Sequence, residues 1–186
     1  MNNQELYESL NYVNHSREKR SEMAEIILQN PELISPLIKI AFDVNDPISS
    51  RACWVMEFTA KQNLSYIYPH LDYFTSNLKS VHLDSSVRPV AKICEYLISA
   101  YFLKADPAVQ KVLNQTFLAR IATACFDWLI GEHKVAAQAY SMTCLLLLGR
   151  KIHWIHEELK LVLEQNYANG SAAYKARARM TLAQLK

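Results

Sequence analysis

The stretch "LDSSVRPVAKICEYLISAY", residues 83–101, carries a strong helical pattern. Its apolar side chains recur every three or four residues, at Val87, Val90, Ala91, Cys94, Leu97, Ile98 and Tyr101. This spacing places them on one face of an α-helix, and that face must be buried against another element. Asp84 or Ser85 is expected to cap the helix, and Pro89 falls in its first turn or so. The stretch therefore predicts a half-buried helix over residues 85–103.

The composition extends this prediction to the whole chain. Of the 186 residues, 51% are hydrophobic and 20% are charged, which is typical of a globular protein. Only three glycines and six prolines interrupt the chain, and so few breakers favour long helices joined by short turns. No stretch alternates apolar and polar residues with β-branched enrichment, so no strand is predicted. The expected fold class is all-α.

Prolines and short polar turns divide the chain into helix pairs. Pro31, Pro47, Pro69 and Pro107 are expected to open helices, whereas Pro36 is expected to kink or split one. Short loops make each pair an antiparallel hairpin. The predicted pairs are 2–13 with 16–29, 31–43 with 47–62, 66–80 with 85–103, 115–130 with 133–149, and 152–166 with 171–185, and a short helix is expected near 107–113.

The helix pairs repeat weakly along the sequence. Arg51 and Arg88 stand 37 residues apart, and so do Gln138 and Lys175. The interval between Arg88 and Gln138 is 50 residues, because residues 104–114 are inserted. A helix-pair period near 40 is typical of α-solenoids, since one pair cannot cover its own apolar face and must stack on its neighbours.

This pattern resembles HEAT repeats, within the armadillo-like superhelix. Such repeats have a proline in the first helix, an aspartate near the turn and a base early in the second helix. Two units match, the first through Pro31, Pro36, Asp43, Asp46 and Arg51, the second through Pro69, Asp84 and Arg88. The third unit has Gln138 in place of the base and no opening proline, and the fourth has Lys175 without the aspartate.

The resemblance covers residues 31–186 and leaves 1–30 as an N-terminal capping hairpin of a single domain. It implies a right-handed α-α superhelix of about four to five helix hairpins whose second helices line a concave face. Proteins of this kind mostly bind other macromolecules, so a protein partner is expected.

Charge is unevenly distributed around the net value of +2. Residues 1–50 carry four Lys/Arg against eight Asp/Glu, and residues 131–186 carry eight against four. This asymmetry allows end-to-end contacts, a basic partner-binding end, or simply an unevenly decorated solvated surface. The oligomeric state stays open.

Basic and aromatic residues on the second helices are the candidate binding residues. The candidates on the concave face are Arg51, Trp54, Arg88, Lys92, Gln138, Lys175 and Arg179. A groove of this chemistry suits acidic peptide segments or phosphate backbones. The resulting hypothesis is a non-enzymatic scaffold that binds a protein or another polyanionic partner through a partly basic face. In the alternative interpretation, Arg51 and Arg88 bond turn residues and tie neighbouring units together.

Two enzymatic hypotheses stand beside the scaffold. HEAT-like DNA alkylpurine glycosylases use an aspartate, a tryptophan and an arginine in a basic groove. The candidates for these roles are Asp127 or Glu57 with Trp54, Trp128, Arg51 and Arg88. The near-neutral net charge weighs against duplex binding, and Trp128 also suits a core position with Asp127 exposed.

The stretch "GSAAYKARAR" is similar to the signature loop of the fumarase/aspartase superfamily, which includes adenylosuccinate lyase. Gly170 and Ser171 match that loop, whereas Tyr174, Arg177 and Arg179 replace its Met, Lys and Asn. The simpler interpretation is a turn in which Gly170 is left-handed and Ser171 caps the next helix.

Metal binding and export are not expected. His153, His156 and Glu157 have a spacing that a metal would accept, but further ligands are missing nearby, so no cofactor is predicted. The four cysteines form no C-x-x-C pair and lie in apolar runs, which indicates reduced thiols. The first residues lack a signal-peptide pattern and no apolar run is long enough to cross a membrane, so a soluble cytoplasmic protein is expected.

Overall fold

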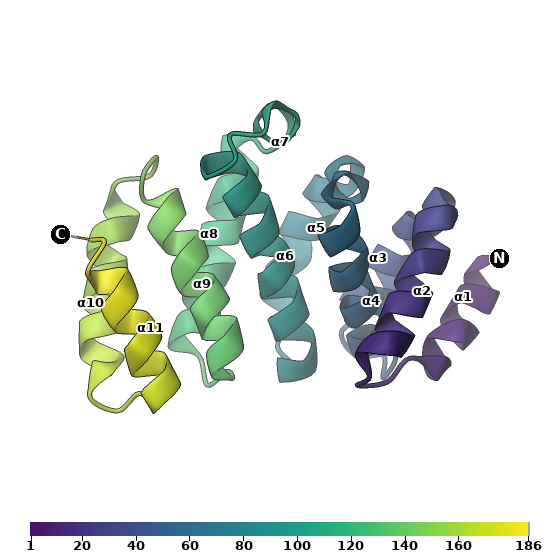
Figure 1. Cartoon of the computed structure of the whole chain (residues 1–186), viewed down its shortest axis with the longest axis horizontal. Helices are drawn as coiled ribbons and strands as arrows, with labels where there is room; N and C mark the ends of the chain where they lie inside the picture. The colour runs from purple at the N-terminus through teal and green to yellow at the C-terminus, as the bar shows by residue number, and fades with distance from the viewer. Residues whose placement is uncertain (186) are drawn as a thin grey trace.

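The computed structural model describes residues 1–185, and within this range all regular structure is helical (Figure 1). The α-helices are α1 (Asn3–Ser9), α2 (Arg17–Gln29), α3 (Ile34–Phe42), α4 (Ser49–Gln62), α5 (Leu71–Asn77), α6 (Asp84–Phe102), α7 (Pro107–Val112), α8 (Gln115–Ile130), α9 (Val135–Leu148), α10 (Trp154–Tyr167) and α11 (Ala172–Leu182). Short 3₁₀ helices are η1 (Leu10–Tyr12), η2 (Pro31–Leu33), η3 (Leu64–His70) and η4 (Leu78–Ser80).

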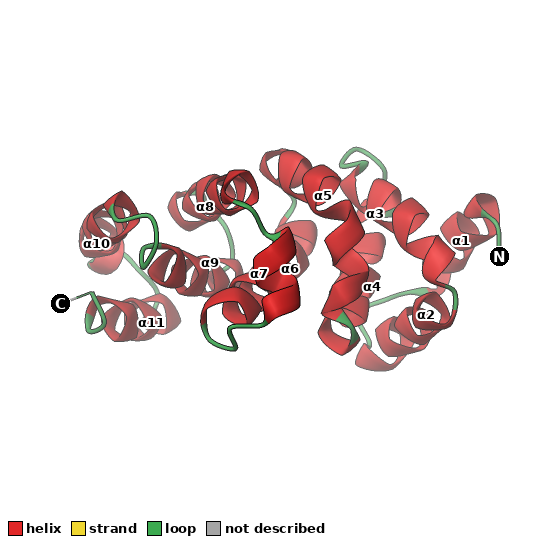
Figure 2. Cartoon of the chain, turned by 90° about the horizontal axis from the view of Figure 1, so that it is seen from above, coloured by secondary structure: helices red, strands yellow, loops and turns green. Residues whose placement is uncertain are grey.

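The helices form two layers, which are seen end-on in Figure 2. Helices α1, α3, α5, α8 and α10 make the outer layer, and α2, α4, α6, α9 and α11 make the inner layer. The two rows bend together, and the inner layer lies on the inside of the bend. Each inner helix packs directly against the next one along the chain. The molecule is therefore an all-α solenoid of five hairpins with α7 inserted, as the period near 40 predicts.

A continuous apolar core runs between the layers from Leu6 to Ala178. The predicted stripe on α6 is buried as expected, with Val87, Val90, Ala91, Cys94, Leu97 and Ile98 fully inaccessible and Tyr101 half-buried. Burial of each large aliphatic side chain contributes about 1.5–3 kcal/mol. Stacking of the hairpins is therefore what stabilises helices that are individually short.

Proline positions explain where the helix boundaries differ from the predicted ones. The predicted helix 31–43 is split into η2 and α3, and Pro36 lies in the first turn of α3, where its missing N–H would have no partner. Pro69 does not open α5 but lies inside η3. Asn63 caps the start of η3, since its side chain accepts a hydrogen bond from the Ser65 N–H. Pro107 opens α7 as predicted.

The cap predicted for α6 is wrong. Leu83 takes the cap position without a side-chain bond, and Asp84 is already the first helical residue. The Asp84 carboxylate instead lies 3.0 Å from Nδ1 of His133, in the turn before α9. The carboxylate thus joins two successive hairpins rather than closing its own helix.

The turn at residues 168–171 lies where the sequence predicts it, but the backbone conformation predicted for its glycine is wrong. Ser171 caps α11, since its hydroxyl accepts from the Tyr174 N–H at 3.2 Å. Gly170 is not left-handed, because no glycine of the described chain has a positive φ. Its small size is what matters here: a Cβ at this position would lie 2.5 Å from Cδ1 of Tyr174. The glycine therefore makes room for an aromatic ring.

Candidate binding groove

A groove of about 500 Å³ crosses four helices of the inner layer. The residues that line this basic groove are Arg17 and Arg20 from α2, Glu57, Phe58 and Lys61 from α4, Arg88, Lys92 and Tyr96 from α6, and Tyr140 from α9. Five of these side chains are basic and one is acidic. The groove therefore concentrates positive charge that the net charge of the whole chain does not reveal.

Helical periodicity aligns these side chains along one face. Arg88, Lys92 and Tyr96 follow one another at intervals of four on α6, and Arg17 and Arg20 are three apart on α2. Residues at these intervals lie one above the other on a helix. Because successive inner helices pack side by side, their polar stripes merge into one surface.

A salt bridge between Glu57 and Arg88 forms the floor of the groove. Nη2 of Arg88 donates to Oε2 of Glu57 at 2.7 Å, and Nη1 lies 3.5 Å from Oε1. Glu57 is only 7% exposed. Burial raises the pKa of the Glu57 carboxyl, because the loss of hydration outweighs the attraction of Arg88, Arg20 and Lys92. The pair links α4 to α6 and holds the Arg88 guanidinium in place.

Arg20 is fixed at the N-terminal end of the groove. Its guanidinium lies over the rings of Trp54 and Phe58, 4.8 and 5.9 Å from their centroids. Its Nη2 and Nε donate to the carbonyl oxygens of His15 (2.7 Å) and Asn14 (3.2 Å). Burial lowers the pKa of Arg20, and repulsion from Arg88 lowers it further. The group is well ordered, yet its charge is poorly compensated.

Lys92 occupies the other end of the groove. Its ammonium lies 4.4 Å from the ring centre of Tyr140 and 5.1 Å from that of Tyr96. It also donates to Oε2 of Glu95. Burial acts to lower the pKa of Lys92, but the hydrogen bond and charge of Glu95 raise it overall. The faces of both tyrosines are therefore covered by a cation.

Of the residues predicted for the concave face, Arg88 and Lys92 line this groove. Trp54 lies beneath it, 8% exposed, with its ring under Arg20 and its Nε1 donating to the Ser85 carbonyl at 2.7 Å. Arg51 donates from Nη1 to the carbonyl oxygen of Asn11 at 2.8 Å, in the preceding hairpin.

The other three predicted residues lie outside the groove lining. Nε2 of Gln138 is 3.5 Å from the carbonyl oxygens of Leu129 and Gly131, beside a hollow between the turns. Arg179 lines a different hollow with α10, and Lys175 is half-buried on α11. The structure thus brings together two of the seven predicted residues and places a third directly underneath.

Several groove residues were missed from the sequence. Arg17 and Arg20 lie in the acidic segment 1–50, so charge counting hides them. Lys61, Tyr96 and Tyr140 stand away from the start of each second helix, where the repeat alignment looks for bases. The usable signal is a polar or aromatic stripe at intervals of three or four on consecutive second helices.

Of the residues named for glycosylase chemistry, Glu57 and Arg88 are bonded in the groove and Trp54 lies beneath it, whereas Arg51, Asp127 and Trp128 lie outside the lining. Trp128 is 2% exposed and its Nε1 donates to the Val81 carbonyl at 3.3 Å, so the predicted core position is confirmed, and Asp127 is exposed on α8. Among residues 1–185 no group of three or more His, Cys, Asp or Glu side chains is placed to hold a metal ion. The cysteines Cys53, Cys94, Cys125 and Cys144 are free and buried, as predicted.

Comparisons with known proteins identify the repeat type. No curated protein and no solved structure matches the chain. None of the helices in the described residues is long and apolar enough to span a membrane. A family model described as a HEAT repeat domain matches residues 7–185, which covers most of the first hairpin and all but the last residue of the predicted range 31–186. With two layers of stacked hairpins and this match over almost its whole length, the chain belongs to the HEAT repeat domain family.

Proposed function

We propose that the chain is a binding scaffold whose basic groove holds an extended acidic segment of a protein partner. The observation that carries this proposal is the composition of the groove, with five bases and one carboxylate on a single inner surface. Glu57 is already paired with Arg88, and Lys92 is paired with Glu95 outside the lining. Arg17, Arg20 and Lys61 are left as positive charges without a salt bridge in the described part of the chain. In this proposal the protein acts by binding alone.

The length of the groove suits a short extended peptide. It crosses four inner helices, and packed helices lie about 8–10 Å apart, so its length is about 24–30 Å. An extended chain advances about 3.3 Å per residue, so this length corresponds to about seven to nine residues. Side chains on alternate positions of such a segment would meet the bases of successive helices.

Two observations favour a peptide over a nucleic acid. Each aromatic ring of the groove has a cation of the protein over one face, because Lys92 lies over Tyr96 and Tyr140 and Arg20 lies over Phe58. Single-stranded nucleic acids need such faces free for base stacking. The net charge of +2 also limits the counterion release that drives duplex binding.

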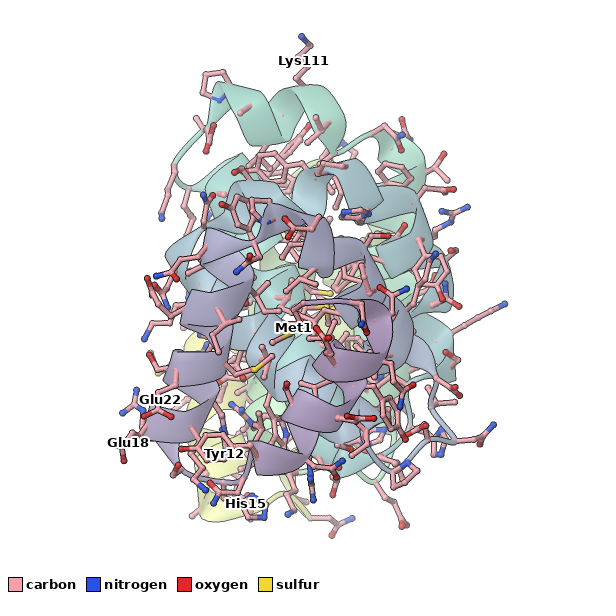
Figure 3. All side chains as sticks on the ribbon, turned by 90° about the vertical axis from the view of Figure 1, so that its right-hand side faces the viewer. Met1, Tyr12, His15, Glu18, Glu22 and Lys111 are labelled. Atoms are coloured by element: carbon pink, nitrogen blue, oxygen red, sulfur yellow. The ribbon has the colours of Figure 1, made fainter. Side chains whose placement is uncertain are left out.

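Charge reversal at the edge of the groove tests the proposal. Arg17 and Lys61 are exposed and make no ion pair within the described part of the chain, so the double variant R17E/K61E should fold. A control, K104E/K111E, makes the same charge change near α7, and Figure 3 shows Lys111 at the top edge of the view and His15 at the bottom edge. Binding of a fluorescent nine-residue glutamate-rich peptide is measured by anisotropy for each protein.

The expected result is a loss of about tenfold or more in affinity for R17E/K61E and less than about twofold for K104E/K111E. Equal losses in the two variants would show that only the net charge matters and would contradict the groove. A labelled duplex or single strand that binds more tightly than the peptide, with a steep salt dependence, would favour the nucleic-acid alternative.

A further inference from the structure

Three arginines converge at the N-terminal end of the basic groove. Arg17 and Arg20 come from α2 and Arg88 comes from α6, and all three line the same hollow. Burial lowers the pKa of Arg20, and repulsion by the charges of both other arginines lowers it further. Arg17 is exposed and Arg20 and Arg88 are half-buried, so this arginine cluster is reached from solvent.

Positive charge in the arginine cluster exceeds the negative charge that the protein itself supplies. Arg17 and the nearby wall residue Lys61 form no ion pair in the part of the chain that the structure describes. Glu57 is the one carboxylate in the lining, and its bonds go to Arg88. Four bases therefore face one acid, and the surplus would be relieved by an anion from outside.

The cluster also holds hydrogen-bond donors in fixed positions. A guanidinium has five N–H donors, and Arg20 is shown using two of its nitrogens, for the carbonyl oxygens of Asn14 and His15. The rings of Trp54 and Phe58 hold its plane in place. The guanidinium of Arg88 is held by its salt bridge to Glu57. The guanidinium groups of Arg20 and Arg88 are therefore already held in place, and an anion that binds here does not lose free energy by ordering them.

We propose that the arginine cluster binds a phosphate monoester dianion, carried as phosphoserine or phosphothreonine within the acidic segment. This inference rests on the proposed function and names the chemistry of one residue of the partner. A phosphate monoester carries about −1.5 to −2 charges at neutral pH and three acceptor oxygens, whereas a carboxylate carries one charge on two oxygens. Only the phosphate matches both the surplus charge and the number of free donors.

Paired peptides test the proposal on the full chain. One nine-residue acidic peptide carries a central phosphoserine, and its partner carries glutamate at that position. Both are titrated against the wild type, R17Q and K92Q by calorimetry, and inorganic phosphate serves as a competitor. Arg17 is exposed, so R17Q should leave the fold intact, and Lys92 lies in the same groove but outside the cluster. Thermal melts confirm folding of each variant.

The expected result is that the wild type binds the phosphopeptide about tenfold more tightly than the glutamate peptide. R17Q should remove most of this preference, K92Q should weaken both peptides alike, and inorganic phosphate should compete with the phosphopeptide more effectively than with the glutamate peptide. Equal affinity of the wild type for both peptides would overturn the phosphate subsite while the acidic-segment proposal survives. Binding of neither peptide would overturn both. A single-stranded oligonucleotide is added as a second competitor. If it displaced the phosphopeptide at a lower concentration than free phosphopeptide does, the proposal that the phosphate is carried by a protein would be overturned.

Discussion

Arg51 and Arg88 occupy equivalent positions on consecutive inner helices, yet they bond to different partners. Each points back to an earlier unit, as expected for a residue that ties repeats together. Arg51 meets the neutral carbonyl of Asn11, whereas Arg88 meets the buried carboxylate of Glu57. The repeat position therefore determines where the arginine lies, and the partner on the preceding unit determines whether it only joins units or also lines a charged groove.

Trp54 lies between the two regions and should give the largest effect. Its ring packs under Arg20 on one side, and its Nε1 bonds the Ser85 carbonyl on the other. Trp54→Ala should lower the free energy of unfolding by about 4 kcal/mol, because it removes a buried aromatic side chain. Urea denaturation measures this loss. Trp154→Ala is the matched control, since Trp154 is 55% exposed, and it should cost less than about 1 kcal/mol.

Arg88→Met should give the next largest effect. It leaves Glu57 buried without its closest partner, and we expect a loss of about 2 kcal/mol in the free energy of unfolding at neutral pH. Adding Glu57→Gln to this variant should recover part of the loss, because no unpaired charge then remains. If Arg88→Met proved no more destabilising than the same change at Arg51, the two positions would be equivalent and the comparison would fail.

Arg51→Met should have a smaller effect and leave binding intact. The variant loses a hydrogen bond to the carbonyl of Asn11, which corresponds to about 1 kcal/mol of unfolding free energy. Its affinity for the acidic peptide should stay within about twofold of the wild type. A loss of peptide binding as large as that of R17E/K61E would place Arg51 in the binding surface.

Glu57→Gln should produce the smallest effect, visible as a dependence on pH. Burial raises the pKa of Glu57 above the ordinary value of 4.5, so the folded chain holds the proton more tightly than the unfolded chain. The stability from this group is fully present below the unfolded pKa and is lost as the pH rises through the folded pKa. Relative to the wild type, the variant should therefore become more stable as the pH rises from 4.5 through the raised pKa of the folded chain. The opposite trend in urea denaturation would mean that Arg88 outweighs burial.

Helix positions could be predicted because the buried face of a helix requires apolar residues at regular intervals of three or four in the sequence. The stripe from Val87 to Ile98 needs only local spacing to be recognised, and Asp106 with Pro107 marks a helix start by local chemistry alone. Gly170 shows the limit of such reasoning. A glycine after a helix suggests a left-handed residue, but here the requirement comes from the ring of Tyr174, which the turn brings close.

The groove was only partly predictable because it is made by contacts between units. The alignment of Arg51, Arg88, Gln138 and Lys175 compares the starts of the second helices, whereas Arg20 reaches the groove because its guanidinium packs on Trp54 of the next inner helix. Between α9 and α11 a separate hollow is lined by Leu146, Leu147 and Met180 together with Arg150 and Arg177. Of the bases on α11, Lys175 and Arg179 lie outside the groove lining, whereas Arg177 lies 3.8 Å from Glu95, the carboxylate that also pairs with Lys92.

The most direct test of the central claim is an NMR titration of the isotope-labelled chain with the glutamate-rich nine-residue peptide. The account predicts that amide shifts change along the groove on α2, α4, α6 and α9, most strongly near Arg20, Lys61 and Lys92, and that the outer layer is unaffected. Changes confined to the outer layer or to α11, or no change at peptide excess, would contradict it.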